Sequence, residues 1–228
     1  IVYDVDYDLI GVIENERNNV YADLFMALCS KHVLENNKGP SIIFDVKCSQ
    51  ALPEYIEKFG GKPLMWKTGH ALLKAKMKET KAPFGGEMSG HIFFADDFFG
   101  FDDAIYSSGR LLQILSRTDK TMAQLIDEVP FFMGTPEIRV ECADEEKFEV
   151  VDELVKYFNQ HYETIDIDGV RVLFGDGWGL VRASNTQPVL VLRFEAKTEQ
   201  RLNEIMDIFK KKLKDFPAVK FNDDDFKF

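Results

Sequence analysis

The chain has 228 residues, which is enough for one large domain or two domains of ordinary size. Hydrophobic residues make up 45% of the sequence and charged residues 29%, a composition typical of a folded globular protein and not of a disordered one. The net charge of −11 argues against a nucleic-acid partner, because binding a phosphate backbone needs clustered Lys and Arg. The net charge is compatible with binding one small phosphorylated ligand, since such a ligand needs only a local basic pocket.

The cysteines and the hydropathy pattern indicate the compartment. Cys29, Cys48 and Cys142 are far apart, odd in number and without metal-ligand spacing, so we expect reduced, structural thiols and a cytoplasmic protein. No apolar run approaches the ~18 residues of a membrane span, and no secretory signal opens the sequence, so no membrane partner is expected. Because the chain starts at Ile1 in a strand-like run, we expect a fragment, a processed chain or a chain that lacks its first residues.

Predicted strands and helices alternate along the first part of the chain. Such alternation favours a largely parallel sheet that helices cover on both faces. In chain order, we predict a helix in 18–37, a strand in 41–46, a short helix in 49–61, a strand followed by a turn in 62–70, a helix in 71–80, a strand in 91–94 and helices in 102–118 and 121–129.

The pattern changes near residues 130–137, which we interpret as a domain boundary. Beyond it we predict an α+β unit, a small antiparallel sheet with helices on one face. Its strands are expected in 137–142, in 168–184 as two strands joined by a turn, and in 188–196.

Two helices complete this second unit in the prediction. We expect Asp144 to cap the first helix, and we expect the second to begin near Thr198. The tail 222–228 is expected to be frayed. The predicted apolar stripes are Phe148, Val151, Leu154, Val155 and Phe158 in the first helix, and Leu202, Ile205, Met206, Phe209 and Leu213 in the second.

Three aspartates alternate with other residues at the start of the chain. In an extended backbone Asp4, Asp6 and Asp8 would share one side, where they repel unless a cation, protons or open water lies among them. Mg²⁺ prefers such oxygen ligands. An EF-hand is excluded, because its sixth position needs Gly and holds Leu9, and its twelfth needs Glu and holds Asn15. Two interpretations of the three aspartates remain open: a metal site or a solvated strand end.

The stretch FGGEMSGH, residues 84–91, combines glycines with polar side chains. Gly85 and Gly86 would let a loop curve around a ligand, while Glu87 and Ser89 suit adjacent sugar hydroxyls. His91 closes the motif. The alternative is an ordinary Gly-rich turn before a strand.

The stretch RASNTQP, residues 182–188, collects hydrogen-bond donors in one short turn. Arg182, Ser184, Asn185 and Thr186 suit a phosphate dianion, and Arg193 on the next strand would reach back to it. The alternative is a hairpin turn with a surface arginine; we favour phosphate because four donors converge.

Lys47 and His70 each follow a predicted buried strand. Ligands of open α/β sheets bind at the carboxyl ends of strands, which makes both residues candidates for ligand contact. His32 and His161 lie in or after helices and are interpreted as structural or surface residues.

Together, four stretches resemble the α-D-phosphohexomutase family, in its phosphomannomutase/phosphoglucomutase branch. They are DVDYD (4–8), KTGH (67–70), GEMSGH (86–91) and RASNTQP (182–188). The resemblance covers essentially the whole chain and implies the end of the second of four domains in 1–17, the third domain in 18–130 and the fourth in 131–228. It implies a three-layer α/β/α sandwich domain followed by a smaller α+β domain like the TATA-binding protein.

The resemblance also implies an activity. Family members interconvert hexose 1-phosphate and 6-phosphate through a bisphosphorylated sugar, using a phosphoserine of the first domain and Mg²⁺. Because that domain is missing, we expect no turnover without the N-terminal phosphoserine domains as partner. The implied roles are metal ligands for Asp4, Asp6 and Asp8; contacts to the phosphorylated hexose for Lys47 and His70; hydroxyl contacts for Glu87 and Ser89; proton transfer for His91; and the non-reacting phosphate for Arg182, Ser184, Asn185 and Thr186.

The sequence departs from the family at the metal loop, which usually has the pattern D-G-D-G-D-R. Val5, Tyr7 and Leu9 replace the glycines and the arginine. Two hypotheses follow: the C-terminal part of a phosphohexomutase, or a non-catalytic phosphosugar-binding protein derived from that family. Neither mannose nor glucose is favoured, since Glu87 and Ser89 would contact hydroxyls common to both.

Overall fold

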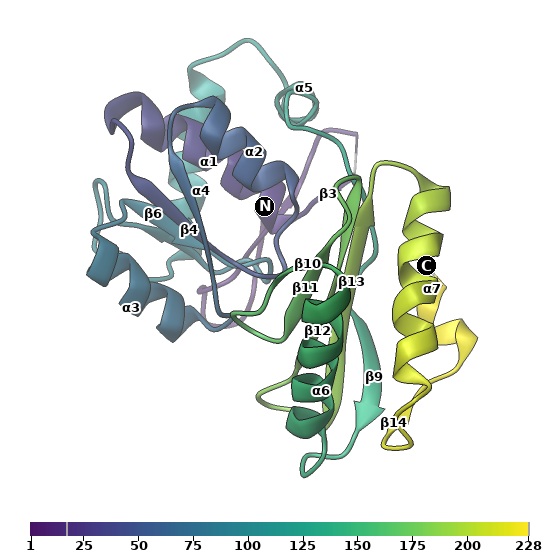
Figure 1. Ribbon diagram of the computed structural model, residues 1–228. Coiled ribbons are helices and arrows are strands. Elements are labelled where there is room, and N and C mark those ends of the chain that lie inside the picture. Colours follow the sequence, from purple (N-terminus) through teal and green to yellow (C-terminus); the bar gives the residue numbers. More distant parts are fainter. Residues whose placement is uncertain (17, 228) are drawn as a thin grey trace. The chain divides into compact units, whose positions relative to one another are not determined.

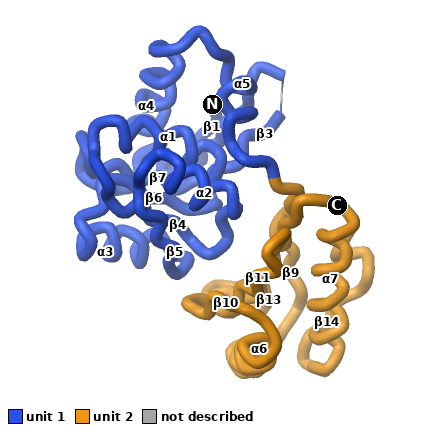
Figure 2. The backbone as a smooth tube through the Cα atoms, turned by 45° about the horizontal axis from the view of Figure 1, so that its top comes forward, with its two compact units in different colours: residues 1–131 blue, residues 132–228 orange. Residues whose placement is uncertain are grey.

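The computed structural model describes residues 1–16 and 18–227. These form two compact units, unit 1 (Ile1–Phe131) and unit 2 (Phe132–Phe228), shown in separate colours in Figure 2. Residues 1–16 lie within unit 1. In the described part of the chain, no helix combines the length and the apolar composition that crossing a bilayer requires.

Unit 1 is built on a sheet with the strand order β5-β4-β6-β7. β4 pairs in parallel with β5 and with β6, which confirms the largely parallel sheet predicted from the alternation of strands and helices. β7 runs antiparallel to β6, because the short turn 87–90 joins the two strands as a hairpin. The strands are β4 (Ser41–Asp45), β5 (Lys62–Trp66), β6 (Phe84–Gly86) and β7 (Ile92–Phe94).

Helices cover both faces of this sheet, as Figure 1 shows. A Cβ atom added to Gly85 would meet Met77 of α3, whereas one added to its neighbour Gly86 would meet Met26 of α1. Successive residues of a strand point to opposite faces, so α3 and α1 lie on opposite sides. The helices are α1 (Ala22–Asn36), α2 (Ala51–Lys58), α3 (His70–Thr80), α4 (Ala104–Ser116) and α5 (Met122–Ile126).

The glycines of the FGG stretch are strand residues, so the predicted loop at this point is wrong. Gly85 and Gly86 are buried in β6. A Cβ on Gly85 would lie 2.8 Å from the carbonyl oxygen of Ile43, and one on Gly86 would lie 2.8 Å from that of His91. Glycine is needed here because the neighbouring backbones approach closely, and not because a loop must curve.

A small antiparallel sheet precedes the main one. It contains β1 (Val2–Tyr3), β2 (Ile10–Ile13) and β3 (Asn19–Val20). Because Tyr3 pairs with Ile10, residues 4–9 form the connection between β1 and β2. The aspartates therefore lie in a bent loop and not in the extended strand from which their shared side was inferred.

Unit 2 is an antiparallel sheet in the order β10-β11-β12-β13-β9-β14, with β8 paired to β13. Its helices α6 and α7 pack on one face, where the rings of Phe158 and Phe209 stack with centroids 4.6 Å apart. This confirms the predicted α+β unit. The elements are β8 (Met133–Gly134), β9 (Ile138–Cys142), α6 (Lys147–His161), β10 (Glu163–Ile165), β11 (Val170–Leu173), β12 (Gly177–Ala183), β13 (Val189–Ala196), α7 (Glu199–Leu213) and β14 (Val219–Lys220).

Two details predicted for α6 are wrong. The cap residue is Glu146, without a side-chain cap bond, because the Asp144 carboxylate instead pairs with the buried Lys147 at 2.5 Å. Phe148 is 54% exposed and lies outside the apolar stripe, with the Lys147 ammonium 5.1 Å from its ring centroid. The other predicted stripe positions are buried or partly buried against the core.

The C-terminal segment is more ordered than predicted up to Lys227; residue 228 of the predicted tail lies outside the described residues. Thr198 caps α7 as expected, since its side chain accepts a hydrogen bond from the N–H of Arg201. The tail, expected to fray, forms a 3₁₀ turn (Asp223–Phe226) that Asn222 caps. Phe226 is buried in the unit 2 core, and this burial holds the tail in place.

All three cysteines are free and buried, as expected for structural thiols. Burial raises the pKa of the Cys29 and Cys142 thiols, which keeps both protonated and unreactive.

The close approach at Gly85 is testable. We expect Gly85→Ala to lower the free energy of unfolding by about 1–3 kcal/mol, because the added methyl group overpacks the space beside Ile43. Gly109→Ala in α4 is the control: its Cβ meets nothing within 4 Å, and it should be neutral or stabilise by up to about 1 kcal/mol. Urea denaturation followed by circular dichroism measures both, and equal midpoints would contradict this account of β6.

Candidate functional site

The loop between β1 and β2 brings three carboxylates together. One oxygen each from Asp4, Asp6 and Asp8 lie within 4.8 Å of one another. The N–H of Leu9 donates to Asp4 Oδ1 at 3.1 Å, which fixes one side of the loop. The three aspartates thus converge although the backbone is bent.

The pKa values of two aspartates in this loop are shifted in opposite directions. The N–H of Leu9 lowers the pKa of Asp4, whereas burial raises the pKa of Asp8, with the charges of Asp6 and Asp4 adding to that effect. An octahedral Mg²⁺ site places ligand oxygens ~3 Å apart in cis and ~4 Å apart in trans, so small side-chain movements would bring these carboxylates onto one ion. The donor set fits Mg²⁺ in chemistry and in size.

Tyr7 holds an unusual backbone conformation within the loop. Its φ is +63°, in the left-handed region where glycine is favoured. A non-glycine residue there costs of order 1 kcal/mol. Val5, the other residue that replaces a glycine of the family pattern, has no such φ and is 96% exposed. Of these two positions, only position 7 has the positive φ that glycine adopts without strain.

Backbone contacts attach the aspartate loop to the β6–β7 hairpin. Leu9 forms an antiparallel bridge with His91, and the N–H of Ile10 donates to the carbonyl of Gly90 at 3.2 Å. A Cβ on Gly90 would lie 2.7 Å from the carbonyl oxygen of Ile10, so the close approach depends on glycine. The predicted metal residues and the predicted sugar-contacting turn are therefore neighbours within unit 1.

Asp102 brings together His70 and His91, two of the predicted site residues. Its Oδ2 lies 2.8 Å from His70 Nδ1 and 3.1 Å from His91 Nδ1, and its Oδ1 accepts a hydrogen bond from Lys74 at 2.6 Å. Burial opposes ionisation of Asp102, but the hydrogen bonds from Lys74 and His70 outweigh it and lower its pKa to about 2. Asp102 was not predicted as a site residue, because nothing local in the sequence distinguishes it from its neighbour Asp103.

Glu87 ties the turn 87–90 to the segment before α3. Its buried carboxylate accepts from the N–H of Gly69 at 2.7 Å and from the hydroxyl of Ser89 at 2.9 Å. Gly69 is the residue that precedes His70 and α3. The KTGH and GEMSGH stretches are thus joined through one carboxylate.

Asp45 performs a similar role at the end of β4 and was also missed. It is fully buried and accepts hydrogen bonds from the N–H of Met88 and from the hydroxyl of Thr68, both at 3.2 Å. The Lys47 ammonium lies 3.8 Å from its Oδ2. A charged residue inside the apolar run SIIFDV was the available signal, because a buried carboxylate needs partners.

In unit 2, the turn predicted to bind phosphate follows β12. Arg182 is buried and its Nε donates to Asp168 at 2.9 Å. The Ser184 hydroxyl accepts from the N–H groups of Thr186 and Gln187 at 3.3 and 3.2 Å, so these two groups stabilise the turn itself. Asn185 and Thr186 are exposed at the tip.

Arg193 lies on the same face of the sheet as Arg182. It pairs with Leu180 across β12 and β13, two residues before Arg182 on the same strand. A Cβ on Gly179 would meet Phe209 of α7, so the arginines point to the face away from the helices. Arg193 contacts Glu195 at 3.0 Å.

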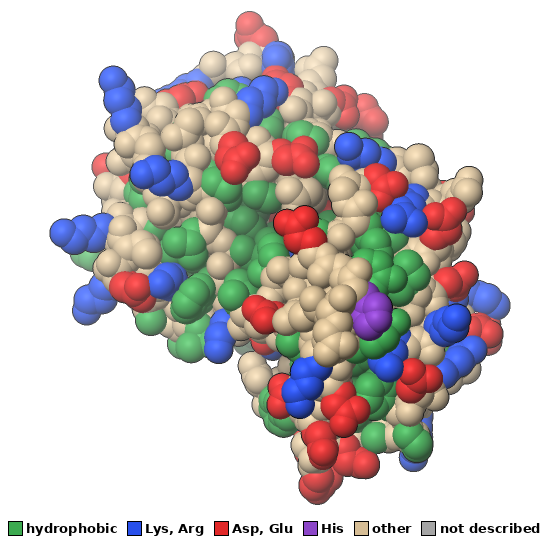
Figure 3. Space-filling view, in the orientation of Figure 1, with side chains coloured by type: hydrophobic (Ala, Val, Ile, Leu, Met, Phe, Trp, Pro, Cys, Tyr) green, Lys and Arg blue, Asp and Glu red, His purple; other side chains and the backbone are tan. Residues whose placement is uncertain are grey.

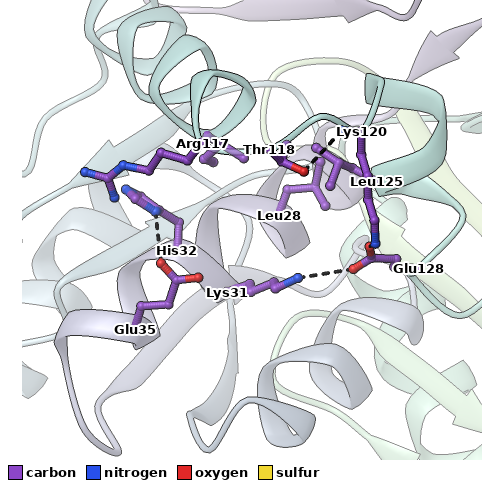
Figure 4. A pocket seen from close by; sticks show the side chains of 10 residues that line it. Leu28, Lys31, His32, Glu35, Arg117, Thr118, Lys120, Leu125 and Glu128 are labelled. Atoms are coloured by element: carbon purple, nitrogen blue, oxygen red, sulfur yellow. Dashed lines mark hydrogen bonds and ion pairs between the residues drawn. The ribbon is translucent and has the colours of Figure 1, made fainter.

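A pocket between α1, α4 and α5 of unit 1 contains, among the described residues, no member of the predicted site (Figure 4). Several of its charged groups are paired: Lys31 and Lys120 contact Glu128 at 3.1 and 2.5 Å, and His32 contacts Glu35 at 3.4 Å. Hydrogen bonds from the two lysines lower the pKa of Glu128. On the face shown in Figure 3, basic side chains are likewise interspersed with acidic ones.

Two family models match most of the chain. Residues 21–131 match the phosphoglucomutase/phosphomannomutase alpha/beta/alpha domain III, and residues 137–212 match the C-terminal domain of the same family. A phosphomannomutase/phosphoglucomutase of Pseudomonas putida is 48% identical over 214 residues, which cover 93% of this chain and 46% of that protein. The chain therefore spans about half the length of this relative.

Solved structures show the same fold. A phosphoglucomutase/phosphomannomutase family protein from Burkholderia thailandensis matches with a TM-score of 0.88 and 42% identity, over 96% of this chain and 47% of that one. An N-acetylphosphoglucosamine mutase of Aspergillus fumigatus, in complex with GlcNAc-6P and magnesium, matches with a TM-score of 0.67 and 16% identity, over 93% and 48% of the two chains. At that identity the second match shows the fold alone.

The lowered pKa of Asp102 predicts a pH dependence of stability. The folded-state pKa lies below the ordinary carboxyl value, so ionised Asp102 stabilises the protein above about pH 4, and this contribution is lost as the pH falls toward 2. We expect Asp102→Asn to lower the free energy of unfolding at pH 7 by about 1–2 kcal/mol. The difference should narrow below pH 4, whereas the exposed Asp97→Asn should show little effect. A pH-independent difference in urea denaturation would contradict the assignment.

Proposed function

The chain belongs to the phosphoglucomutase/phosphomannomutase family, and from this premise we propose that it is the C-terminal, substrate-binding part of a phosphohexomutase. Such an enzyme interconverts hexose 1-phosphate and 6-phosphate through a bisphosphorylated sugar. One observation carries the proposal: the aspartate loop, the KTGH segment and the GEMSGH turn form a connected network of hydrogen bonds in unit 1. Phosphoryl donation is assigned to the part of the relatives that this chain does not span.

The residues around the β6–β7 turn suit a sugar. A carboxylate offers about four lone-pair sites, so Glu87 retains acceptor capacity for hydroxyls beyond its bonds to Gly69 and Ser89. Lys47 and His70 follow β4 and β5 at the ends of the sheet where α/β proteins bind ligands. We assign sugar hydroxyl contacts to Glu87 and Ser89 and contacts to the hexose or its phosphate to Lys47 and His70.

The turn after β12 suits a phosphate group. Asp168 holds Arg182 through Nε, which leaves the two terminal guanidinium nitrogens to face a dianion. Asn185 and Thr186 add donors at the exposed tip, and Ser184 stabilises the turn that presents them. We assign the non-reacting phosphate to this turn, with Arg193 as a further cation on the same face.

Asp4, Asp6 and Asp8 would hold Mg²⁺. The ion would offset the burial that raises the pKa of Asp8 and the repulsion from Asp6 and Asp4 that adds to it, and when bound it would neutralise charge on the transferring phosphoryl group. The fungal mutase with the same fold is described in complex with magnesium. The three buried free thiols favour a reducing compartment, in keeping with a cytoplasmic location.

A non-catalytic phosphosugar-binding role is the alternative. Two features favour the binding role: the strained φ of Tyr7, and Leu9 in place of the arginine of the family pattern. Both weaken the part of the site that acts on the phosphoryl group. Adding the separately produced N-terminal half of the Pseudomonas putida relative with glucose 1,6-bisphosphate separates the two. Recovered mutase turnover would support the enzyme, and sugar-phosphate binding without turnover would support the binding protein.

Binding of glucose 6-phosphate tests the phosphate assignment. We expect Arg182→Ala to weaken the affinity about 10- to 100-fold in isothermal titration calorimetry, because it removes a charged donor from a buried position. Arg201→Ala on α7 is the matched control, since Arg201 pairs with Asp176 and Glu204 at the surface and should leave affinity unchanged. Equal affinities of the two variants would refute the assignment.

Mg²⁺ binding tests the aspartate loop. We expect weak binding by the parent chain, weaker binding by Asp6→Asn and tighter binding by Tyr7→Gly, which relieves about 1 kcal/mol of backbone strain. Val5→Gly is the control for added flexibility and should not tighten binding, because position 5 has no positive φ. No calorimetric Mg²⁺ signal from any of the four proteins would exclude the site.

A further inference from the structure

Asp102 lies where two imidazoles converge. The rings of His70 and His91 stack with centroids 4.9 Å apart and an interplanar angle of 27°, and their Nδ1 atoms lie 2.8 and 3.1 Å from the same carboxylate oxygen. We infer that Asp102 is a positioning residue that holds both histidines in the tautomer protonated on Nδ1. Each Nε2 then carries a lone pair that accepts a hydrogen bond from a sugar hydroxyl.

The charge of Asp102 decides which atoms around it donate hydrogen bonds. Lys74 donates to Oδ1 at 2.6 Å, and this contact favours the ionised form of the carboxylate. An ionised carboxylate only accepts hydrogen bonds. The Lys74 ammonium also lies 3.4 Å from His70 Nδ1, but its short hydrogen bond goes to Asp102 Oδ1 at 2.6 Å. His70 Nδ1, 2.8 Å from Oδ2, is therefore assigned as the donor to the carboxylate, and a neutral imidazole with a proton on Nδ1 has none on Nε2.

His91 also has its Nδ1 close to the Asp102 carboxylate. Its Nδ1 is buried and makes no hydrogen bond of good geometry within the described residues, yet it lies 3.1 Å from Asp102 Oδ2 and 3.8 Å from Asp8 Oδ2. A buried nitrogen that faces two acceptors is satisfied only when it carries a proton, which a small ring rotation would direct at Asp102. The backbone bridge to Leu9 holds His91 in this place.

A transition-metal ion is the competing explanation for this cluster. His70, His91 and Asp102 each offer a ligand atom within 4.8 Å of the others. A tetrahedral site with ~2.0 Å bonds would separate its ligand atoms by ~3.3 Å, whereas the Nδ1–Oδ2 distances are 2.8 and 3.1 Å, in the range of hydrogen bonds. The Lys74 ammonium on the same carboxylate would also repel a metal ion. The geometry favours hydrogen bonding.

The tautomer decides what the two histidines present to a sugar. This role toward a sugar rests on the proposed function. A lone pair on Nε2 accepts a proton or a hydrogen bond from a hydroxyl, whereas the opposite tautomer would present a donor there. Two stacked rings with the same tautomer would offer two such acceptors side by side. Asp102 would thus decide what both histidines present to a ligand without contacting it.

Nitrogen NMR of the labelled chain tests the tautomers directly. Long-range ¹H–¹⁵N correlation spectra at pH 8.5, where free imidazole is neutral, distinguish protonated Nδ1 from protonated Nε2. His70→Gln and His91→Gln assign the signals. His161 is an internal standard, because its Nδ1 lies 2.7 Å from the Tyr157 carbonyl oxygen and must carry a proton.

We expect at least a tenfold excess of the Nδ1–H form for both histidines in the parent chain. Asp102→Asn should reduce that excess several-fold at His70 and His91 and leave His161 unchanged. Lys74→Met, which keeps the acceptor, should retain the parent tautomers. A parent spectrum with His70 protonated on Nε2 would overturn the inference, and so would tautomers that Asp102→Asn leaves unaltered.

Two additions separate this inference from its alternatives. Glucose 6-phosphate should shift the Nε2 signals of His70 and His91; absence of any binding would count against the proposed function while the tautomer assignment stands. Sugar binding with the opposite tautomer would support the function and refute the inference. Equimolar Zn²⁺ that selectively displaces the Nδ1 protons of His70 and His91, and not that of His161, would assign the cluster as a metal site and overturn the positioning role.

Discussion

Buried carboxylates that accept backbone N–H groups are the constraint on which the unit 1 site depends. Glu87 accepts from Gly69, and Asp45 accepts from Met88, so the loops after β5 and β6 are each held by a charge that belongs to another segment. A buried carboxylate is costly unless it is hydrogen-bonded. Moving either loop would leave a charge unsatisfied, which is why loops on the surface of the sheet are held in one arrangement.

The aspartate loop is a contrasting case, because it is held by its neighbours more than by its own sequence. The bridge from Leu9 to His91 and the hydrogen bond from Ile10 to Gly90 fix its C-terminal end, while its interior contains like charges and the strained backbone of Tyr7. Strain of this kind persists only when surrounding structure imposes it. The loop therefore keeps the shape that suits a cation although the residues between its aspartates do not favour that shape.

The two faces of the unit 2 sheet carry different kinds of side chain. One face packs on α6 and α7, where Gly179 allows Phe209 to approach the strands. The opposite face carries Arg182 and Arg193, each oriented by an acidic neighbour on the same unit. A buried arginine with a carboxylate partner is well placed to receive an anion, because its fork is already fixed in one direction.

By itself the sequence determined the order of the elements, the two kinds of unit and the four motifs, because periodicity and short spacing are local properties. Tertiary structure alone decided that FGG is a strand, since the contacts that require Gly85 and Gly86 come from Ile43 and His91. It also decided the roles of Asp45 and Asp102 and the ordered tail at Phe226. Each of these depends on partners distant in the chain, and a local pattern holds no information about which segments pack together.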